Sequence, residues 1–243
     1  MTREEIINII TESQLNQIKS LDGIGKSEHF LKGPQLAGVT RNGQNIGWGN
    51  STYKNVPVLQ PLTDLENWSK VITKYQPDIF IEMGVAKGGN VLYVNDLLGD
   101  LGKKPIIYGV DIEDSLSSEP KELENFTFIQ KSTLDLDLIE TIKNLIELNK
   151  DKKVLIHFDD CHFSHHVLQE LEIYSKIIKE GDIIIVGDTW DEGWYESPFK
   201  ALCDFMSTDS SMTIDVDLHQ EMVMPCNWIF GILQKKIKYD TSI

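Results

Sequence analysis

The sequence Ile79-Phe-Ile-Glu-Met-Gly-Val-Ala-Lys-Gly-Gly-Asn90 decides the fold of this chain. Its first half is an apolar run that closes on Glu82, which is typical of a central strand buried on both faces of a parallel sheet. Gly84, Gly88 and Gly89 follow, and glycines let the backbone turn sharply and approach a ligand closely. The helix predicted after them would present its N-terminus to the same ligand. The stretch therefore predicts a strand, a glycine-rich turn and a helix around a binding site.

The acid at the end of this predicted strand indicates which class of cofactor the turn accepts. A dinucleotide needs room and free backbone amides for its pyrophosphate, whereas a carboxylate at position 82 suits a cationic group. S-adenosyl-L-methionine (SAM) carries a sulfonium and an ammonium group and has no phosphate. The pattern Gly-x-x-x-Gly-Gly, which starts at Gly84, also departs from the Gly-x-Gly-x-x-Gly of dinucleotide sites. Glu82 therefore favours SAM over NAD.

Composition narrows the class of protein. The chain has 243 residues, of which 41% are hydrophobic, and no linker-like segment divides it, so we expect one substantial domain. The net charge of −15 argues against a nucleic-acid partner, since phosphate contacts need clustered Lys and Arg. No apolar run is long enough to span a membrane, and the polar start does not resemble a signal peptide. Three cysteines without metal-type spacing suit a reducing cytoplasm.

Predicted strands and helices alternate along the chain, which indicates a Rossmann-like α/β sheet. Besides the strand that ends at Glu82, strand candidates are Ile106–Asp111, Phe126–Gln130, Val154–Asp159, Asp182–Asp188, Met212–Val216 and Trp228–Gln234. Helix candidates are Thr63–Tyr75 (with a capping start at Thr63), Asn90–Leu98, Leu134–Asn149, His166–Lys179 and Pro198–Met206. We expect residues 61–243 to form seven mostly parallel strands with helices on both faces. Residues 1–60 are predicted to be an N-terminal helix (3–20) and an irregular arm (21–60).

Ligands of such sheets bind beyond the carboxyl ends of the strands, so the residues that follow each strand are the candidates for chemistry. Asp111 ends the second predicted strand, where an acid commonly accepts two hydrogen bonds from ribose hydroxyls. This arrangement serves NAD and SAM alike. Asp111 therefore predicts a nucleoside without identifying it, and the alternative is a solvated loop residue that binds nothing.

Two further acids follow neighbouring predicted strands. Asp159 ends the fourth strand and Asp188 ends the fifth, so their carboxylates could converge on one hard cation such as Mg²⁺. Such an ion would polarise a substrate hydroxyl, lower its pKa and orient it toward a methyl group. His162, three residues after Asp159, has an ordinary pKa suited to accepting the proton. The simpler alternatives are that Asp188 only caps a turn with Thr189 and that His162 only bonds a loop.

Several motifs together resemble one enzyme family. They are Tyr53–Pro57, Gln60–Asp64, Pro77–Gly89, Asp159–Tyr174, Glu180–Asp182, Val186–Thr189, and Ile214–Leu218 with Asn227. They resemble the cephalosporin hydroxylase/rhamnosyl O-methyltransferase family over residues 45–235. Members of that family are similar to class I SAM-dependent O-methyltransferases, many of which depend on Mg²⁺. The resemblance implies the class I methyltransferase fold and a homo-oligomer.

The resemblance also implies a role for individual residues. SAM would contact Glu82, Met83, Gly84, Gly88, Gly89, Asn90, Asp111 and Ile112. The metal ion would contact Asp159 and Asp188, and His162 would be the catalytic base. His165 and His166 lie close in sequence and remain open as alternatives for the base.

Two departures from the family pattern bear on these roles. The family often has a glutamate before the aspartate of the fifth strand, and this chain has Gly187 there, so one expected metal ligand is missing. Either another acid replaces it or the metal is bound weakly or not at all. The candidates to replace it are Asp160, Asp191 and Glu192. Lys131 stands where members often have an aspartate, which leaves the adenine side of the pocket undefined.

The leading hypothesis is an enzyme that transfers a methyl group from SAM to a hydroxyl of a sugar or natural-product intermediate. The alternatives are an NAD-linked oxidoreductase on a similar sheet, a non-catalytic scaffold that retains the fold, and an iron hydroxylase that uses His157, Asp159 and His219. We disfavour the hydroxylase, because iron triads of this kind belong to β-barrels and His157 lies inside an apolar strand. Acceptor contacts are expected from residues 21–60 and the loop Trp190–Pro198.

Overall fold

The computed structural model describes residues 39–41, 51–189, 196–209, 211–223, 226–228 and 230–236. The predicted N-terminal helix (3–20) and most of the predicted arm lie outside this part of the chain, as does most of the loop predicted to bind the acceptor. Within the described residues, no helix combines the length and the apolar character needed to cross a membrane.

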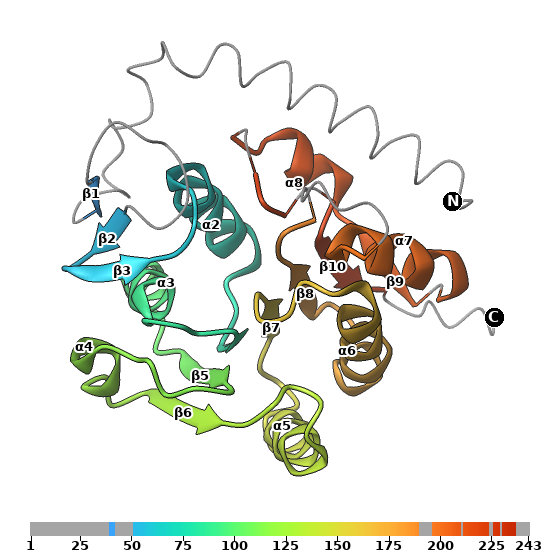
Figure 1. Cartoon of the computed structure of the whole chain (residues 1–243), viewed down its shortest axis with the longest axis horizontal. Coiled ribbons are helices and arrows are strands. Elements are labelled where there is room, and N and C mark those ends of the chain that lie inside the picture. Colours follow the sequence, from blue (N-terminus) through green and yellow to red (C-terminus); the bar gives the residue numbers. More distant parts are fainter. Residues whose placement is uncertain are drawn as a thin grey trace.

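A seven-stranded sheet forms the centre of the molecule (Figure 1). Its strands, in spatial order, are β6 (Phe126–Gln130), β5 (Ile106–Asp111), β4 (Ile79–Met83), β7 (Val154–Phe158), β8 (Ile183–Val186), β10 (Ile232–Lys235) and β9 (Met212–Ile214). The pairs from β6 through β8 are parallel, whereas β10 runs antiparallel to both of its neighbours. The predicted mostly parallel sheet of seven strands is confirmed.

Helices cover both faces of this sheet (Figure 1). One face carries α2 (Leu62–Tyr75), α3 (Gly89–Asp100) and the short α4 (Ser118–Lys121). The other carries α5 (Leu136–Leu148), α6 (Ser164–Ile177) and α7 (Pro198–Thr208). The local sequence explains the start of α5, where the carboxylate of Asp135 accepts hydrogen bonds from the backbone N–H groups of Asp137 and Leu138. All residues of β4, β7 and β8 are buried, as expected of strands covered on both faces.

The start of α2 differs from the predicted capping motif at Thr63. The helix begins at Leu62 after Pro61, and no side chain caps it. The nearby Asp64 is fully buried, and its carboxylate accepts hydrogen bonds from the backbone N–H of Asn227, 163 residues away. The predicted capping start at Thr63 was therefore wrong, and the acid next to it binds the distant backbone of Asn227 instead.

Residues 39–58 contain a second, three-stranded antiparallel sheet that the sequence did not predict. It consists of β1 (Val39–Arg41), β2 (Ser51–Tyr53) and β3 (Val56–Val58). The prediction of an irregular segment was wrong here, because Lys54 and Asn55 both take positive φ angles (49° and 68°) and turn β2 into β3. The division of the chain at residue 60 stays a prediction.

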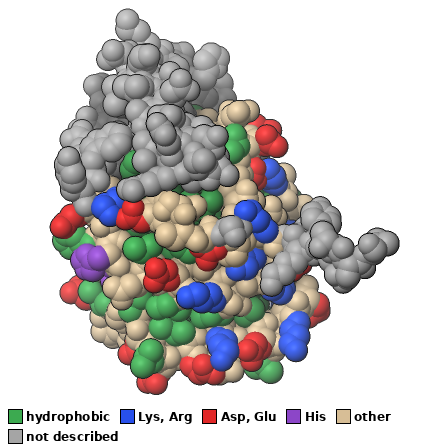
Figure 2. All heavy atoms as spheres, turned by 90° about the vertical axis from the view of Figure 1, so that its right-hand side faces the viewer, with side chains coloured by type: hydrophobic (Ala, Val, Ile, Leu, Met, Phe, Trp, Pro, Cys, Tyr) green, Lys and Arg blue, Asp and Glu red, His purple; other side chains and the backbone are tan. Residues whose placement is uncertain are grey.

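Several predicted boundaries differ by a few residues, and two of the differences have a clear local cause near the end of the described chain. The strand predicted over Trp228–Gln234 begins only at Ile232, since Phe230 has a left-handed backbone (φ 53°). The strand predicted over Met212–Val216 ends at Ile214, and Asp215 then caps the short helix α8 (Val216–Gln220). On the face shown in Figure 2, acidic and basic side chains are interspersed.

Candidate functional site

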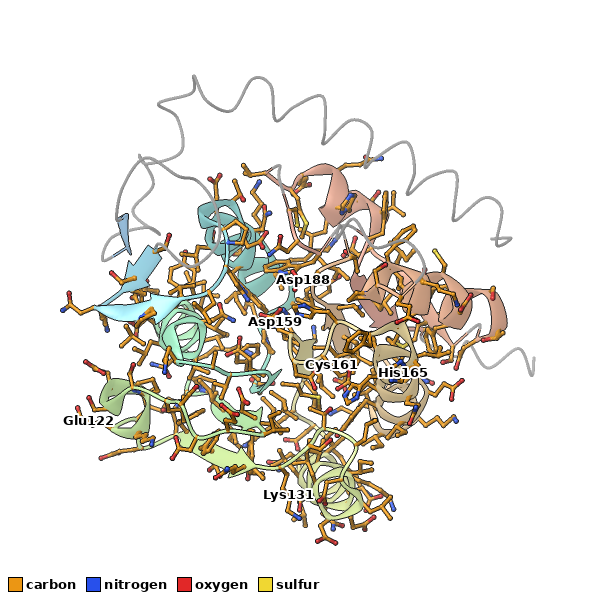
Figure 3. All side chains as sticks on the ribbon, in the orientation of Figure 1. Glu122, Lys131, Asp159, Cys161, His165 and Asp188 are labelled. Carbon is orange, nitrogen blue, oxygen red and sulfur yellow. The ribbon has the colours of Figure 1, made fainter. Side chains whose placement is uncertain are left out.

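The acids chosen from the sequence gather at the carboxyl edge of the parallel strands. Glu82 lies near the end of β4, Asp111 ends β5, Asp159 follows β7 and Asp188 follows β8. Figure 3 shows Asp159 and Asp188 close together at the centre of the molecule. The pairing of β7 with β8 explains this, because the backbone N–H of Gly187, before Asp188, donates to the carbonyl oxygen of Phe158, before Asp159, at 2.7 Å.

The turn after β4 is pressed against the loop that follows β7. Gly84 has a φ of 87°, and a Cβ atom at this position would lie 2.2 Å from the carbonyl oxygen of Asp159. Only glycine fits such a contact, so the first predicted glycine of the motif is required by geometry. The turn ends at Gly88, from which α3 begins with its N-terminus at the same edge of the sheet.

Glu82 carries a buried charge that the described residues only partly compensate. The side chain is 1% exposed, and its Oε1 accepts a hydrogen bond from Nδ2 of Asn90. Nδ1 of His157 lies 3.5 Å from the same oxygen, whereas the buried Oε2 has no hydrogen-bond partner among the described residues. A buried carboxylate oxygen without a donor fits a cationic ligand such as the ammonium group of SAM.

Asp111 accepts hydrogen bonds from the backbone, in addition to the contact with ribose that the sequence predicts. Its Oδ2 accepts from the backbone N–H of Ala86 at 3.0 Å, and its Oδ1 accepts from that of Glu113 at 3.1 Å. These bonds tie the glycine turn to the end of β5. Each carboxylate oxygen has a second lone-pair direction, so ribose hydroxyls can still bind there.

Two cavities adjoin this edge of the sheet and share Gly84, Ala86 and Asp159. The larger has a volume of about 410 Å³, and the predicted residues Asp111 and Ile112 line it. The smaller, of about 20 Å³, is lined by four other predicted residues, namely Glu82, Gly88, Gly89 and Asn90. Met83 lines neither cavity, because its side chain is buried in the core. The wall of the larger cavity also contains Lys131, Asp160 and His166, which the sequence suggested for other roles. Sequence reasoning missed Thr133 and Cys161.

Asp159, His162 and Asp188 form a group that could hold a metal ion. One ligand atom from each lies within 4.8 Å of the others, and Nε2 of His162 is 2.7 Å from Oδ2 of Asp188. Asp188 has a left-handed backbone (φ 50°), and its buried Oδ1 has no hydrogen-bond partner among the described residues. A strained residue with an unsatisfied carboxylate oxygen is typical of a binding site.

The charges around this group favour a cation. Burial and the neighbouring Asp188 raise the pKa of Asp159 to about 7, although His157 and a hydrogen bond from Gln60 oppose the rise. Burial also raises the pKa of Asp64, and repulsion from the carboxylates of Asp159 and Asp188 adds to the rise. Several acids thus crowd together out of water, and a divalent ion would stabilise their ionised forms.

The structure narrows the candidates for the missing third metal ligand. Oδ2 of Asp160 accepts a hydrogen bond from the Thr133 hydroxyl at 2.9 Å and lies 3.3 Å from Nε2 of His166, so Asp160 belongs to a separate cluster. Asp191 and Glu192 lie outside the described residues. A Cβ atom at Gly187 would lie 2.7 Å from Oδ1 of Asp159, so a side chain at that position would collide with this carboxylate.

Of the three histidines proposed for proton transfer, only His162 lies in the group with Asp159 and Asp188. His166 is paired with Asp160 and, at 3.6 Å, with Glu170, and these contacts raise its pKa to about 10. The ring of His165 stacks on Phe163, away from the central acids (Figure 3).

The structure does not bring the three residues of the iron-triad alternative together. His157 and Asp159 lie with Glu82 in a second group of possible ligands, but His219 does not belong to it. His157 is completely buried in β7, with ring contacts to Trp68 and Trp228 at centroid distances of 5.0 and 5.9 Å. His219 lies on α8, where it packs against Phe230, and its metal-binding atoms are not grouped with those of Asp159. The fold is also the parallel α/β sheet rather than a β-barrel.

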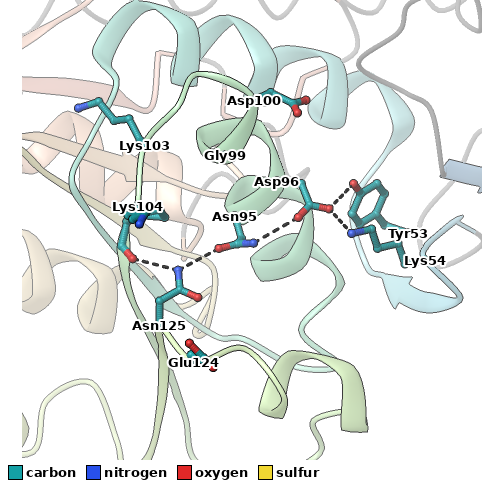
Figure 4. Close-up of a pocket in the computed structure, with 11 residues that line it drawn as sticks. Tyr53, Lys54, Asn95, Asp96, Gly99, Asp100, Lys103, Lys104, Glu124 and Asn125 are labelled. Atoms are coloured by element: carbon teal, nitrogen blue, oxygen red, sulfur yellow. Dashed lines mark hydrogen bonds and ion pairs between the residues drawn. The ribbon is translucent and has the colours of Figure 1, made fainter.

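A larger cavity, of about 670 Å³, lies at the other end of α3 (Figure 4). Its residues include Pro105, which precedes β5, so it adjoins the amino edge of the sheet. Both acidic and basic side chains line it, and Asp96 accepts a hydrogen bond from Tyr53 and pairs with Lys54. Ligands of parallel sheets bind at the opposite edge, so volume alone does not identify the site.

Comparison with known proteins agrees with this geometry. The family described as Rhamnosyl O-methyltransferase/CmcI matches residues 45–235. A rhamnosyl O-methyltransferase of Mycobacterium tuberculosis is 24% identical over 146 residues, which cover 60% of this chain and 59% of the relative. One from Mycobacterium leprae is 22% identical over 145 residues, covering 60% and 63%. The chain thus spans about three-fifths of the length of these relatives.

Solved structures support the same conclusion for the fold. The structure titled cmcI-D160 Mg-SAM has a TM-score of 0.63 and 16% sequence identity, and the match covers 84% of each chain. The structure titled cmcI-N160 SAH has a TM-score of 0.61 and covers 84% of this chain and 91% of that one. The central sheet is therefore the class I methyltransferase fold, as predicted. Together with the family match over residues 45–235, this confirms the resemblance found in the sequence, and the chain belongs to the rhamnosyl O-methyltransferase/CmcI family.

Proposed function

We propose that this protein is a SAM-dependent O-methyltransferase, assisted by a divalent cation, that methylates a hydroxyl of a sugar or natural-product intermediate. The observation that carries the proposal is the convergence of Asp159, His162 and Asp188 beside the cavity that begins at the glycine turn. Membership in the rhamnosyl O-methyltransferase/CmcI family supports it.

The cofactor would lie along the two neighbouring cavities. When bound, SAM supplies a methyl group activated by its sulfonium. Glu82 accepts hydrogen bonds from the ammonium group on its free oxygen, Asp111 accepts from the ribose hydroxyls, and Ile112 offers an apolar surface to the nucleoside. The NAD alternative is disfavoured, because a pyrophosphate at the glycine turn would meet the negative charges of Glu82 and Asp159.

The acids and the histidine beyond the cofactor would prepare the acceptor hydroxyl. Asp159 and Asp188 would hold Mg²⁺, which polarises a bound oxygen and lowers the pKa of its hydroxyl. His162 is 48% exposed, so it can reach an acceptor. Its Nε2 faces Oδ2 of Asp188 and donates to it, so Nδ1 is the nitrogen that accepts the proton. Asp188, 2.7 Å away, stabilises the imidazolium that forms.

The nature of the acceptor rests on the relatives and on charge. The matched relatives are named rhamnosyl O-methyltransferases, which supports a sugar hydroxyl. The net charge of −15 disfavours a strongly anionic acceptor or a nucleic acid. No disulfide joins the described cysteines, which is in keeping with the proposed cytoplasmic location. We also propose a homo-oligomer, as the family resemblance implies.

Titration calorimetry with SAM, with S-adenosylhomocysteine and with NADH tests the cofactor. We expect the first two to bind and NADH not to bind. Binding of NADH without binding of SAM would overturn the proposal in favour of an oxidoreductase. Methyl transfer to rhamnosides, measured with and without EDTA, then separates an enzyme from a scaffold. SAM binding without methylation of any rhamnoside or other sugar hydroxyl would favour the scaffold.

Variants of the polar group test its roles. We expect Asp159→Asn to abolish the response of methyl transfer to Mg²⁺, and His162→Gln to lower the rate at neutral pH by about 10²-fold. Activity that EDTA and Asp159→Asn leave unchanged would remove the metal from the mechanism. A His162→Gln enzyme with the wild-type rate would remove the base.

A further inference from the structure

We propose that Gln60 is a positioning residue that fixes the Asp159 carboxylate for a divalent cation, and that Trp68 fixes Gln60 in turn. The inference rests on the proposed function, because it takes Asp159 as a ligand of that cation. The inference goes beyond the proposed function, because it gives a role in the site to a residue outside the predicted catalytic domain.

The direction of the Gln60 amide follows from its partners. The indole Nε1 of Trp68 can only donate, and it lies 3.0 Å from the Gln60 side chain, so the atom that faces it is the carbonyl oxygen Oε1. The amide nitrogen Nε2 must then point the other way. It donates to Oδ2 of Asp159 at 3.0 Å.

Both members of this chain of hydrogen bonds are held rigidly. Gln60 is 4% exposed, and Trp68 is completely buried. The Trp68 ring contacts Phe80, His157 and Trp228 at centroid distances of 5.6, 5.0 and 4.6 Å. Because the indole cannot rotate in this packing, its N–H group keeps the amide in one orientation.

As a consequence, the two carboxylate oxygens of Asp159 have different neighbours. Oδ2 is occupied by the Gln60 amide, whereas Oδ1 faces Gly187, the residue before Asp188. A cation between Asp159 and Asp188 would therefore meet one defined oxygen of a carboxylate that cannot turn. Hydrogen bonds of this kind to a ligating carboxylate typically change metal affinity by 10- to 100-fold.

Binding of Mn²⁺ to the full chain, measured by calorimetry, tests the inference. We compare the wild type with Gln60→Met, which keeps the length of the side chain but removes both hydrogen bonds. The Kd for Mn²⁺ is expected to rise by about 10- to 100-fold. The Kd for S-adenosylhomocysteine, measured without metal, is expected to change less than the Kd for Mn²⁺. Gln60 lines the smaller cavity, but its side-chain hydrogen bonds among the described residues go to Asp159 and Trp68.

Asn67 supplies a matched control on the same helix as Trp68. It is a completely buried amide that exchanges two hydrogen bonds with the backbone of Val223, at 2.8 and 2.9 Å. Asn67→Leu is expected to lower the unfolding temperature while leaving the Kd for Mn²⁺ unchanged. Should Gln60→Met not fold, Trp68→Phe tests the same link by removing the indole N–H, and a smaller rise in the Kd is expected.

Each outcome has a distinct meaning. A Mn²⁺ Kd in Gln60→Met within twofold of the wild type overturns the positioning role and leaves the proposed function intact. An equal loss of Mn²⁺ affinity in Asn67→Leu overturns it too, because the effect would then follow from general destabilisation. A wild-type protein that binds S-adenosylhomocysteine but no Mn²⁺ overturns the inference together with the metal-assisted mechanism, while the cofactor assignment stands.

Discussion

Glu82 is the residue on which the choice of cofactor depends. Its carboxylate is buried and receives a hydrogen bond from Asn90 on one oxygen only. A phosphate could not approach this oxygen, whereas an ammonium group would satisfy it. The presence of an acid at a strand end followed by glycines was visible in the sequence, but the unsatisfied oxygen became apparent only from the structure.

Glu82→Gln tests this residue directly. The substitution preserves shape and removes the charge, so an ammonium group would lose a charge-assisted hydrogen bond worth about 1.5–3 kcal/mol. We expect the Kd for S-adenosylhomocysteine to rise by about 10- to 100-fold in calorimetry. Asp96→Asn, in the larger cavity of Figure 4, is the control and should leave the Kd unchanged. A raised Kd in Asp96→Asn together with an unchanged Kd in Glu82→Gln would instead place the cofactor in that larger cavity.

Glu170 makes the stability of the protein depend on pH. It is completely buried on α6, and burial raises its pKa to about 7, although the neighbouring His166 opposes the rise. The folded state therefore binds more protons than the unfolded state between about pH 4.5 and 7. Stability from this group is present below that range and is lost as the pH rises through 7.

Glu170→Gln is expected to flatten this dependence, because glutamine does not titrate. Relative to the wild type, the variant should gain free energy of unfolding between pH 5.5 and pH 8, as measured by urea denaturation at both values. Two curves that stay parallel across this range would show that Glu170 is ionised in the folded protein at all of these pH values.

The sequence did not predict contacts between residues that lie far apart in the chain. Gln60 and Asp159 are 99 positions apart, and no local pattern links a glutamine before a helix to an acid after a strand. His166 and Glu170 have the i, i+4 spacing of a helical pair and could have been noticed. The burial of His166 and Glu170 could not be predicted, since it depends on α6 packing over the loop that contains Thr133.

At the scale of elements, the contact between β3 and α3 explains why the motif contains two adjacent glycines. A Cβ atom at Gly89 would lie 2.3 Å from the carbonyl oxygen of Pro57 in β3. Gly89 was predicted as a cofactor contact, and that role stays a prediction, but packing alone already requires a glycine there. The small N-terminal sheet is thereby attached to the helix that begins at the cofactor site.

Gly89→Ala is expected to destabilise the protein by about 1–3 kcal/mol, because the backbone of β3 must move away. Gly99→Ala is the matched control in the same helix. A Cβ there meets nothing within 4 Å, so alanine should stabilise the protein by about 0.5–1 kcal/mol through its higher helix propensity. Thermal unfolding measures both. Equal effects of the two substitutions would show that β3 does not pack against α3.

The accuracy of the predicted strand boundaries does not follow burial. β5 and β6 match their predicted boundaries although no residue of β6 is fully buried, whereas the fully buried β8 is three residues shorter than predicted. The hairpin β2–β3 was missed because its strands are three residues long and lie in a polar segment. Its signal was the dipeptide Lys54-Asn55, which takes the turn conformation without a glycine.

At the scale of the whole molecule, the buried acids predict that divalent cations stabilise the fold. A ligand that binds only the folded state raises its stability by about 2.7 kcal/mol at a concentration of 100 times its Kd. Mn²⁺ should therefore raise the unfolding temperature in a saturable way, and Asp159→Asn should not respond. NaCl at matched ionic strength is the control. An equal rise with NaCl would mean that Mn²⁺ acts only by screening the net charge of −15.

The hydrogen bonds between Asp64 and Asn227 join the beginning of α2 to the segment before β10, across 163 positions. Contacts of such long sequence separation form late, because a large loop must close before they stabilise anything. Thr189, beside Asp188, also donates to the carbonyl oxygen of Asn227. A ribosome-bound chain that has not yet released residue 227 cannot make these bonds. During synthesis, we therefore expect the segment that carries Asp188 to be fixed only after residue 227 has emerged.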